Sequence, residues 1–359
     1  MNIYEKRVNL VKNKIAEQNL DGLYITNLTN VRYLTGFTGS AASVLILEKS
    51  QHFFSDTRYD QQSKDQIKNC QIHMIENGYE QTIKKNNILS NGINIGFEAE
   101  HTSYHSYQRL KSILNNVNLK ETSQIVEHIA AIKDSSEIES LKSAIEITDE
   151  VFNQIIPDLK EGAVEKEIAA KISYLFKMNG AEGDSYDPII ASGFLGALPH
   201  ARPSDKKFEK GDFVVMDFGA LYQGYHADMT RTVVIGEATS KHHEIYDIVL
   251  KSQLNGIRVA KEGVTGEQVD MACRDIITNA GYGKEFCHST GHGIGLEVHT
   301  YPRLSIHNKK PLLKNYVVTI EPGIYIPSWG GVRIEDDCLI REKDCLPLNK
   351  STKEMLILN

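Results

Sequence analysis

The sequence Val214-Val215-Met216-Asp217-Phe218-Gly219 returns in similar form as Val318-Thr319-Ile320-Glu321-Pro322-Gly323. In both segments an apolar run typical of a buried strand leads into an acid, and glycine follows two residues later. Three further matches keep the same order along the chain: residues 160–163 with 261–264, Gly180 with Gly281, and residues 193–200 with 292–299. Because the order is kept, the sequence predicts two related halves, each a helix followed by strands, that face each other across one cleft.

Each half carries a second acid beyond a turn. Asp228 precedes the apolar run at 229–235, and the turn-like segment 219–224 separates it from Asp217. Glu335 follows the run at 331–334. We therefore expect Asp217 and Asp228 to lie on paired strands of a hairpin, and the second half to repeat this arrangement. If the halves face each other, four carboxylates converge.

Such a cluster requires compensation. Two carboxylates ~4 Å apart repel by roughly 4 kcal/mol at an effective dielectric constant of 20. Protonation could relieve this repulsion, but two divalent cations balance all four charges. His292, between two glycines that allow close approach of the backbone, adds an imidazole. Each residue alone is more often a turn, cap or core residue, whereas the five together favour a metal site. Nitrogen and oxygen ligands without thiolate suit Mn, Co, Fe or Zn better than Ca.

Four further residues are candidates for roles beside the metal site. His200 and His299 occupy equivalent positions in the two halves, where they could bind a substrate carbonyl or move a proton, or serve as structural histidines. Arg333 shares a strand face with Glu335 and could orient a ligand carboxylate from outside the metal shell. The planar fork of Arg303 could bind a substrate carboxylate, or it could form a surface salt bridge.

The whole chain has room for two cores. It has 359 residues, of which 41% are hydrophobic and 24% charged. Helical and strand patterns alternate in the first third, which predicts an α/β domain over residues 1–127. Asp134 and Glu137 form a capping-box pattern that begins a long amphipathic helix through Ile155. This helix opens a second, α+β domain over residues 128–359.

Composition excludes several classes of protein. With 40 Lys and Arg against 47 Asp and Glu, the formal net charge is -7, so the basic excess of nucleic-acid-binding proteins is missing. Five cysteines without a CxxC spacing argue against a disulfide framework and a thiolate zinc site, and favour reduced thiols in the cytoplasm. No signal-peptide pattern and no run of about 18 apolar residues is present, so we expect no membrane span.

Taken together, these motifs resemble a known family. Asp217 with Asp228, and the segments 291–295, 321–325 and 331–336, are similar to those of the Xaa-Pro dipeptidase and aminopeptidase P group. These are pita-bread metallopeptidases of the creatinase–prolidase group, related to methionine aminopeptidase. Residues 29–40 and 56–59 resemble the amino-terminal domain of the same group. The resemblance covers nearly the whole chain and implies a pita-bread catalytic domain with two pseudo-symmetric halves.

The resemblance also implies roles for the candidate residues. Two metal ions, which we expect to be manganese, would be bound by five side chains: Asp217, Asp228, His292, Glu321 and Glu335. Asp228 and Glu335 would bridge the two ions. Glu321 would also pass on a proton. His200 and His299 would assist substrate binding and stabilise the tetrahedral intermediate, and Arg303 would contact the carboxylate of a dipeptide. The resemblance further implies a homodimer. Two positions depart from the family pattern: Thr300 stands where the family commonly has an acid, and Leu195 stands where it usually has Asn. Both departures concern the substrate subsites, and neither changes the five metal ligands.

The predicted activity is hydrolysis of the bond between an N-terminal residue and proline, in dipeptides or in longer peptides. Two alternatives remain. A methionine-aminopeptidase-like enzyme usually lacks an amino-terminal domain such as residues 1–127. A non-catalytic scaffold that binds a protein partner would have no need to keep all five ligands.

Overall fold

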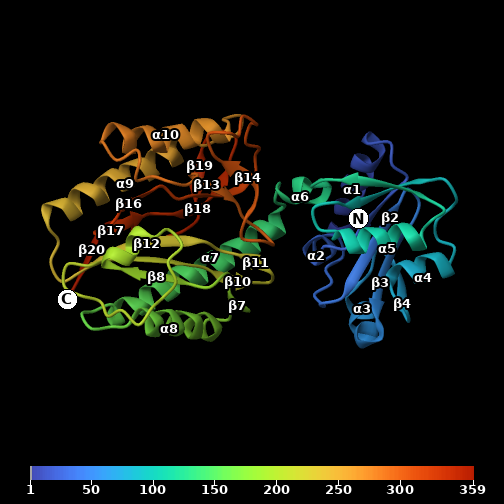
Figure 1. Ribbon diagram of the computed structural model, residues 1–359, viewed down its shortest axis with the longest axis horizontal. Helices are drawn as coiled ribbons and strands as arrows, with labels where there is room; N and C mark the ends of the chain where they lie inside the picture. The colour runs from blue at the N-terminus through green and yellow to red at the C-terminus, as the bar shows by residue number, and fades with distance from the viewer. Residues whose placement is uncertain (1) are drawn as a thin grey trace. The chain divides into compact units, whose positions relative to one another are not determined.

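The computed structural model describes residues 2–359, which form two compact units with the division after Ala130 (Figure 1). The first unit is built on a six-stranded mixed sheet with the strand order β4-β3-β2-β1-β5-β6. Its strands are β1 (Gly22–Ile25), β2 (Ala42–Leu47), β3 (Gln51–Asp56), β4 (Gln71–Ile75), β5 (Asn94–Glu98) and β6 (Asn118–Thr122). Its helices are α1 (Ile3–Glu17), α2 (Leu28–Thr35), η1 (Thr57–Tyr59), α3 (Asp60–Gln66), α4 (Tyr79–Lys85), α5 (Tyr104–Ile113) and α6 (Ile125–Ala130).

Helices cover both faces of this sheet. The side chains of Tyr24, Leu45 and Phe54 pack against Ile83 of α4 and Leu110 of α5. Helices α1 and α2 contact β1 and β2 in the same unit. Because the central strands are buried on both sides, they consist of nearly continuous apolar residues rather than an alternating pattern. The expected α/β alternation of the first third is therefore confirmed.

The second unit consists of two halves, each of which begins with two long helices and continues into antiparallel strands. The first half contains α7 (Ser135–Ile155), η2 (Ile156–Asp158), α8 (Glu165–Met178), β7 (Gly183–Asp184), β8 (Ile189–Ser192), η3 (Gly193–Ala197), β9 (Phe213–Phe218), β10 (Ala220–Tyr222), β11 (Tyr225–His226) and β12 (Met229–Ile235). The second contains α9 (Ser240–Val259), α10 (Gly266–Asn279), β13 (Gly291–Gly293), β14 (Thr300–Leu304), β15 (Val317–Ile320), β16 (Gly323–Ile326), β17 (Gly330–Arg333), β18 (Asp336–Ile340) and β19 (Cys345–Pro347). The final strand, β20 (Leu356–Leu358), returns to the first half and pairs with β12.

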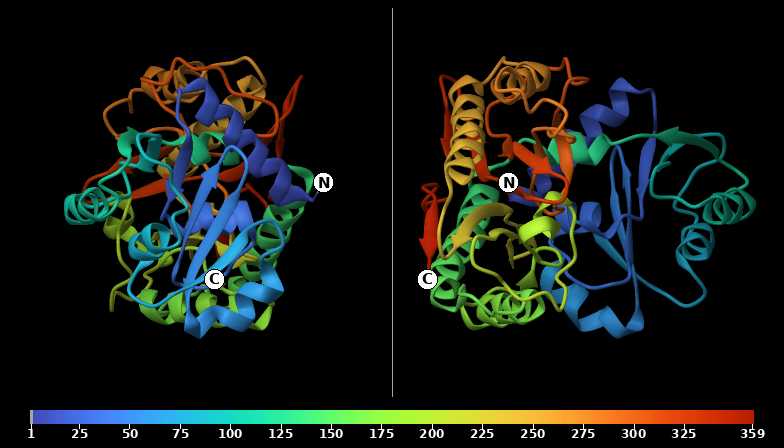
Figure 2. Two further views of the ribbon diagram at one scale, coloured as in Figure 1. Left: turned by 90° about the vertical axis from the view of Figure 1, so that its right-hand side faces the viewer. Right: turned by 60° about the vertical axis from the view of Figure 1, so that its left-hand side comes forward.

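The repeat is visible in the strand pairing. In the first half β9 pairs antiparallel with β12, and the short pair β10–β11 is inserted between them in sequence. In the second half β15 pairs antiparallel with β18, and β16–β17 is inserted in the same way. Helices α7 and α8 pack against strands of the first half, and α9 and α10 pack against strands of the second (Figures 1 and 2). The two related halves inferred from the repeated segments are thus present.

One local expectation needs correction. The segment 219–224 was expected to be a plain turn, yet Ala220–Tyr222 forms β10, which pairs with both β7 and β11. The turn itself is confined to Gln223 and Gly224, both of which have positive φ. Two short strands therefore separate Asp217 from Asp228, and the β9–β12 hairpin contains an inserted hairpin.

The helix that opens the second unit begins as expected. The Asp134 side chain accepts hydrogen bonds from the backbone N–H of Ser136 and Glu137, and Glu137 accepts one from the N–H of Asp134. This capping box satisfies donors that have no partner within the helix. The buried stripe along α7 includes Leu141, Ile145 and Phe152. Among residues 2–359, no helix is long and apolar enough to cross a lipid bilayer.

Gly219 is required by close approach of the backbone. A Cβ at this position would lie 1.7 Å from the carbonyl oxygen of Ala227, which lies between β11 and β12. We expect Gly219→Ala to lower the free energy of unfolding by about 1–3 kcal/mol, because the backbone must shift to relieve the overlap. Urea titration followed by circular dichroism measures this change.

Gly183→Ala is the matched control, since a Cβ on this β7 glycine meets no atom within 4 Å. It should leave the free energy of unfolding nearly unchanged. Equal losses in the two variants would show that close packing at Gly219 is not the reason for the glycine.

Candidate active site

A cavity of about 410 Å³ lies within the second unit. Its lining includes all nine residues expected from the sequence to form the site: His200, Asp217, Asp228, His292, His299, Arg303, Glu321, Arg333 and Glu335. These side chains come from both halves. The lining also includes residues that the sequence did not indicate, notably Tyr186 and His288.

The strand register explains how four acids converge. Asp217 lies in β9 opposite Thr230, and Asp228 directly precedes β12. In the second half Ile320 pairs with Asp336, so Glu321 and Glu335 directly flank this last pair of the ladder. Each half thus presents two acids at one end of an antiparallel ladder, and the two ends contribute to the same cavity.

His292 lies among these acids. Its Nε2 atom is 3.3 Å from Glu321 Oε1 and 3.6 Å from Asp228 Oδ2. Asp228, His292 and Glu335 each offer a ligand atom, and these three atoms lie within 4.8 Å of one another. All three residues are buried. A divalent ion with N/O ligands at about 2.0–2.2 Å fits such a group.

Burial dominates the electrostatics of the site. It raises the pKa of Asp228 and Glu335 well above their ordinary values, and the neighbouring acids raise them further. It also raises the pKa of Glu321 to about 7. For His292, burial and the nearby His299 lower the pKa to about 3, which keeps the imidazole neutral, the form that ligates a metal.

An unpartnered atom tests whether the residues fit a cation. Glu335 Oε1 is buried and has no hydrogen-bond partner among the described residues. A buried carboxylate oxygen without a partner is costly, and a cation would satisfy it. The donor set of four carboxylates and one neutral imidazole therefore fits divalent metal ions.

Two side chains hold Asp217 in place. Arg333 Nη2 donates to Asp217 Oδ2 at 2.5 Å, and the Tyr186 hydroxyl lies in short contact with Oδ1 of both Asp217 and Asp228. Arg333 was expected to orient a ligand carboxylate, and the carboxylate that it contacts is that of Asp217. Tyr186 carries no sequence signal, because a single tyrosine in a loop between β7 and β8 is unremarkable until the fold places it.

A hydrogen-bonded chain extends from Arg333 to His288. Arg333 Nη1 donates to the Tyr325 hydroxyl at 2.8 Å, and this hydroxyl lies 2.8 Å from His288 Nε2. Burial lowers the pKa of His288 to about 4, so the ring is neutral. With His288 Nδ1 donating to the carbonyl of Ser289, Nε2 is left to accept from Tyr325. His288 lies four residues before His292, a spacing that could have drawn attention to it.

The cavity has a buried floor and an exposed mouth. Asp228, His292 and Glu335 are buried, whereas His200, His299 and Arg303 are exposed. Arg303 pairs directly with His292 in the β13–β14 ladder, so the two lie side by side across the strands. The arrangement places charged and hydrogen-bonding groups where a small polar ligand would enter.

Known proteins resemble this chain over its whole length. The model of the creatinase/prolidase N-terminal domain matches residues 7–132, and that of metallopeptidase family M24 matches residues 139–342. An uncharacterized peptidase of Bacillus subtilis, YqhT, is 42% identical over 97% of this chain and 99% of its own. An Xaa-Pro dipeptidase of Pyrococcus furiosus is 39% identical over 95% of this chain and 96% of its own.

The fold is likewise that of a solved enzyme. The structure of an Xaa-Pro dipeptidase from Bacillus anthracis superimposes with a TM-score of 0.95 at 40% sequence identity, covering 99% of this chain and 100% of that one. The two-domain, pita-bread architecture expected from the sequence is therefore confirmed.

The raised pKa of Glu321 predicts a pH-dependent stability of the metal-free protein. A carboxyl whose pKa rises from 4.5 to about 7 on folding stabilises the fold fully below pH 4.5. This stabilisation is lost as the pH rises towards 7, with a slope of up to about 1.4 kcal/mol per pH unit from one group. Urea unfolding at a series of pH values in the presence of EDTA measures it.

Two comparisons check the cause. Glu321→Gln should reduce the slope between pH 4.5 and 7 by the share of one group, because Asp228 and Glu335, whose pKa values burial also raises, still contribute. Saturating Mn²⁺ should abolish the slope, because a cation stabilises the ionised carboxylates. If the dependence of the free energy of unfolding on pH stays the same in Glu321→Gln and in the presence of Mn²⁺, the titrating group is not Glu321.

Proposed function

Because the chain belongs to metallopeptidase family M24, with a creatinase/prolidase N-terminal domain, we propose that it hydrolyses the peptide bond between an N-terminal residue and proline. The observation that carries this proposal is the convergence of four carboxylates and one neutral imidazole on the floor of a cavity with two histidines and an arginine at its mouth. The Xaa-Pro dipeptidase of Pyrococcus furiosus is one relative whose name specifies this reaction.

In this proposal two divalent ions, manganese first among them and Co, Zn or Fe as alternatives, bind to the floor of the cavity. As the family resemblance implies, Asp228 and Glu335 would be shared by both ions, Asp217 would hold one, and His292 and Glu321 would hold the other. When bound, such ions polarise the substrate carbonyl and lower the pKa of water. The close group of Asp228, His292 and Glu335 supports this assignment.

The protein's own residues then handle protons and charge. Glu321 takes up a proton from the attacking water and passes it to the leaving nitrogen. His200 and His299 donate hydrogen bonds to the oxyanion that develops on the carbonyl. Although His299 is exposed as a residue, partial burial of its ring and the nearby Arg303 lower its pKa, so the ring is neutral and retains one N–H for this purpose.

Proline sets the specificity of the proposed reaction. Its nitrogen carries no hydrogen when acylated, so the scissile bond is a tertiary amide and recognition depends on the shape of the ring. The Arg303 guanidinium, opposite His292 in the ladder, would bind the free carboxylate of a dipeptide through two parallel hydrogen bonds. This residue favours dipeptides over longer substrates.

We further propose that the chain acts as a homodimer in the cytoplasm. The family resemblance supports the dimer, and five cysteines in the free state are compatible with a reducing compartment. Analytical ultracentrifugation of the full chain would test the first statement.

The assignment of Asp228 predicts the effect of its replacement. Asp228→Asn should lose at least one of two bound ions and most of the peptidase activity, because a neutral amide is a much weaker ligand than a carboxylate. Metal content per chain after dialysis against Mn²⁺, measured by mass spectrometry, checks this. Asp344→Asn, at an exposed surface pair with Arg341, is the control.

Full metal content and activity in Asp228→Asn would refute the bridging assignment. No metal uptake by the unaltered chain would favour the non-catalytic scaffold instead. Cleavage of Met-Ala peptides in preference to Xaa-Pro peptides would favour a methionine-aminopeptidase-like enzyme.

The proposed role of Arg303 predicts a difference between substrates. Arg303→Met should raise KM for Xaa-Pro dipeptides by roughly 10–100-fold, since a hydrogen bond to a charged group contributes about 1.5–3 kcal/mol. KM for Xaa-Pro-Yaa tripeptides should change much less, because their carboxylate lies one residue further on. Release of free proline from dipeptides and of the N-terminal residue from tripeptides provides the rates.

Arg202→Met is the matched control, because Arg202 also lines the cavity but pairs with Asp187. It should leave the ratio of the two KM values unchanged. Equal effects of Arg303→Met on both substrate lengths would contradict the proposed carboxylate contact.

A further inference from the structure

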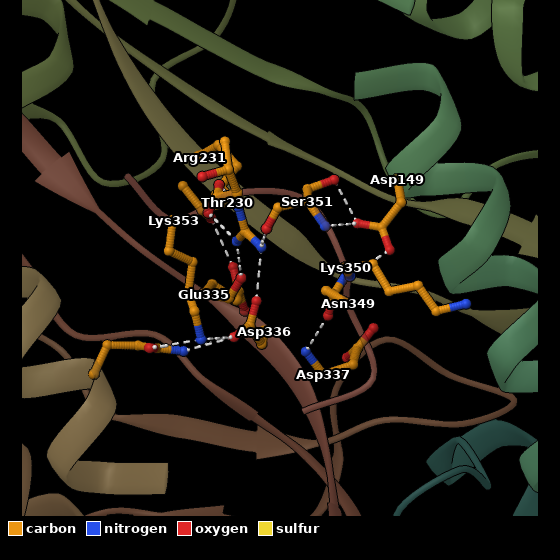
Figure 3. Close-up of polar contacts among 12 residues, drawn as sticks. Asp149, Thr230, Arg231, Glu335, Asp336, Asp337, Asn349, Lys350, Ser351 and Lys353 are labelled. Atoms are coloured by element: carbon orange, nitrogen blue, oxygen red, sulfur yellow. Dashed lines mark hydrogen bonds and ion pairs between the residues drawn. The ribbon is translucent and has the colours of Figure 1, made fainter. Parts of the chain in front are cut away.

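A buried polar network adjoins β12 and β18, the strands that directly follow Asp228 and Glu335 in the sequence (Figure 3). We call it the polar frame, and it consists of Arg231, Asp336, Asp337 and residues 349–353. None of these residues lines the cavity. Arg231, Asp336 and Asp337 are at most 2% exposed, so the frame belongs to the interior of the second unit.

Arg231 occupies the centre of the frame. Its guanidinium makes five hydrogen bonds: to the carbonyl oxygens of Thr230 (3.0 Å), Glu335 (2.5 Å), Ser351 (3.0 Å) and Thr352 (2.9 Å), and to Asp336 Oδ1 (2.8 Å). One side chain thus joins β12, the start of β18 and the C-terminal segment. The bond to the carbonyl of Glu335 holds the backbone of a proposed metal ligand.

Asp337 makes the reciprocal link to the other ligand. Its Oδ2 accepts a hydrogen bond from the backbone N–H of Asp228 at 2.9 Å, and its own N–H donates to Asn349 Oδ1 at 2.8 Å. A third link is made between side chains, where Thr230 Oγ1 donates to Glu335 Oε2 at 2.6 Å. The segments of Asp228 and Glu335, one from each half, are therefore tied together at three points.

The C-terminal segment is itself anchored. Asp149 of α7 accepts hydrogen bonds from the backbone N–H of Lys350 (2.7 Å) and Ser351 (3.0 Å). Lys353 Nζ lies 2.6 Å from Asp336 Oδ2, which also accepts from Gln253 of α9 at 3.0 Å. Helices from both halves thus fix the segment against which Arg231 and Asp337 are held.

We propose that Arg231 and Asp337 are positioning residues that set the spacing of Asp228 and Glu335, and thereby the affinity of the site for divalent ions. The inference rests on the proposed function, because it presupposes that these two acids bind metal. The geometry supports it: the frame bonds to the backbone of both acids rather than to their free oxygens, leaving Glu335 Oε1 without a partner. Groups that orient metal ligands in this way typically change affinity 10–100-fold when removed.

The test measures the dissociation constant for Mn²⁺ by competition with a fluorescent chelator, on the full chain and its variants. Arg231→Lys should weaken binding by about 10–100-fold, because one ammonium cannot span five acceptors. Asp337→Leu should do the same, since it removes the acceptor of the Asp228 N–H. Asp337→Asn should bind nearly as well as the unaltered chain, because it keeps an oxygen acceptor at this position.

A milder variant guards against a failure to fold. Asn349→Ala removes only the acceptor of the Asp337 N–H at a half-buried position, and it should weaken binding by about fivefold, the equivalent of one neutral hydrogen bond. Ile172→Ala is the control for stability alone. This α8 residue is fully buried in an apolar cluster that contains no residue of the polar frame, so the variant should lower the free energy of unfolding without changing the dissociation constant.

The outcomes separate the two proposals. If the unaltered chain takes up no Mn²⁺, the metal site itself is refuted and the frame positions nothing. If the unaltered chain binds Mn²⁺ and the frame variants bind it equally well, the positioning role alone is overturned. Loss of affinity in Ile172→Ala equal to that in Arg231→Lys, or equal loss in Asp337→Asn and Asp337→Leu, would also overturn it.

Discussion

Mutual repulsion among four carboxylates in one buried place is the constraint that shapes the second unit. Burial and neighbouring charge raise the pKa of Asp228, Glu321 and Glu335, and the nearby imidazole of His292 stays neutral. A folded chain tolerates such a cluster only if protons or cations neutralise it. Arg333 provides one positive charge next to Asp217, which is insufficient for four acids. The surrounding architecture is therefore best understood as a support for bound cations.

The duplication of the second unit brings the four acids together. Each half ends an antiparallel ladder with a pair of acids, β9 with β12 in one case and β15 with β18 in the other. Two similar ladders that face the same cavity bring four carboxylates together without any long loop. Links between the halves, such as Thr230 to Glu335 and Asp337 to Asp228, then hold the ladders in register. Rigid strands position ligands more accurately than loops do.

Burial divides the cavity into two functional layers. Burial at the floor raises the pKa of Asp228 and Glu335, whereas His200, His299 and Arg303 at the mouth are exposed to solvent. Electrostatic interactions are stronger in the buried layer than in the exposed one, because the effective dielectric constant is lower there. Thr300, which departs from the family pattern, directly follows His299 of the mouth in the sequence. The acids of the floor are held more firmly, since Asp217 accepts from Arg333, Glu335 accepts from Thr230, and Glu321 accepts from Thr319.

Local sequence determined much of this protein. Apolar runs, the Asp134 capping box and the repeated acids predicted the strands, the helix α7 and the paired halves, because each depends on residues close together in the chain. Tyr186, His288 and the polar frame were missed. Their roles depend on contacts such as Arg231 with Glu335, between residues far apart in sequence, and an isolated tyrosine or arginine gives no local sign of such a partner. The sequence thus determined which acids form the cluster and next to which strands they lie. Only the packing of the two halves decided which side chains hold these acids, because side-chain hydrogen bonds across a fold form only after the strands are in register.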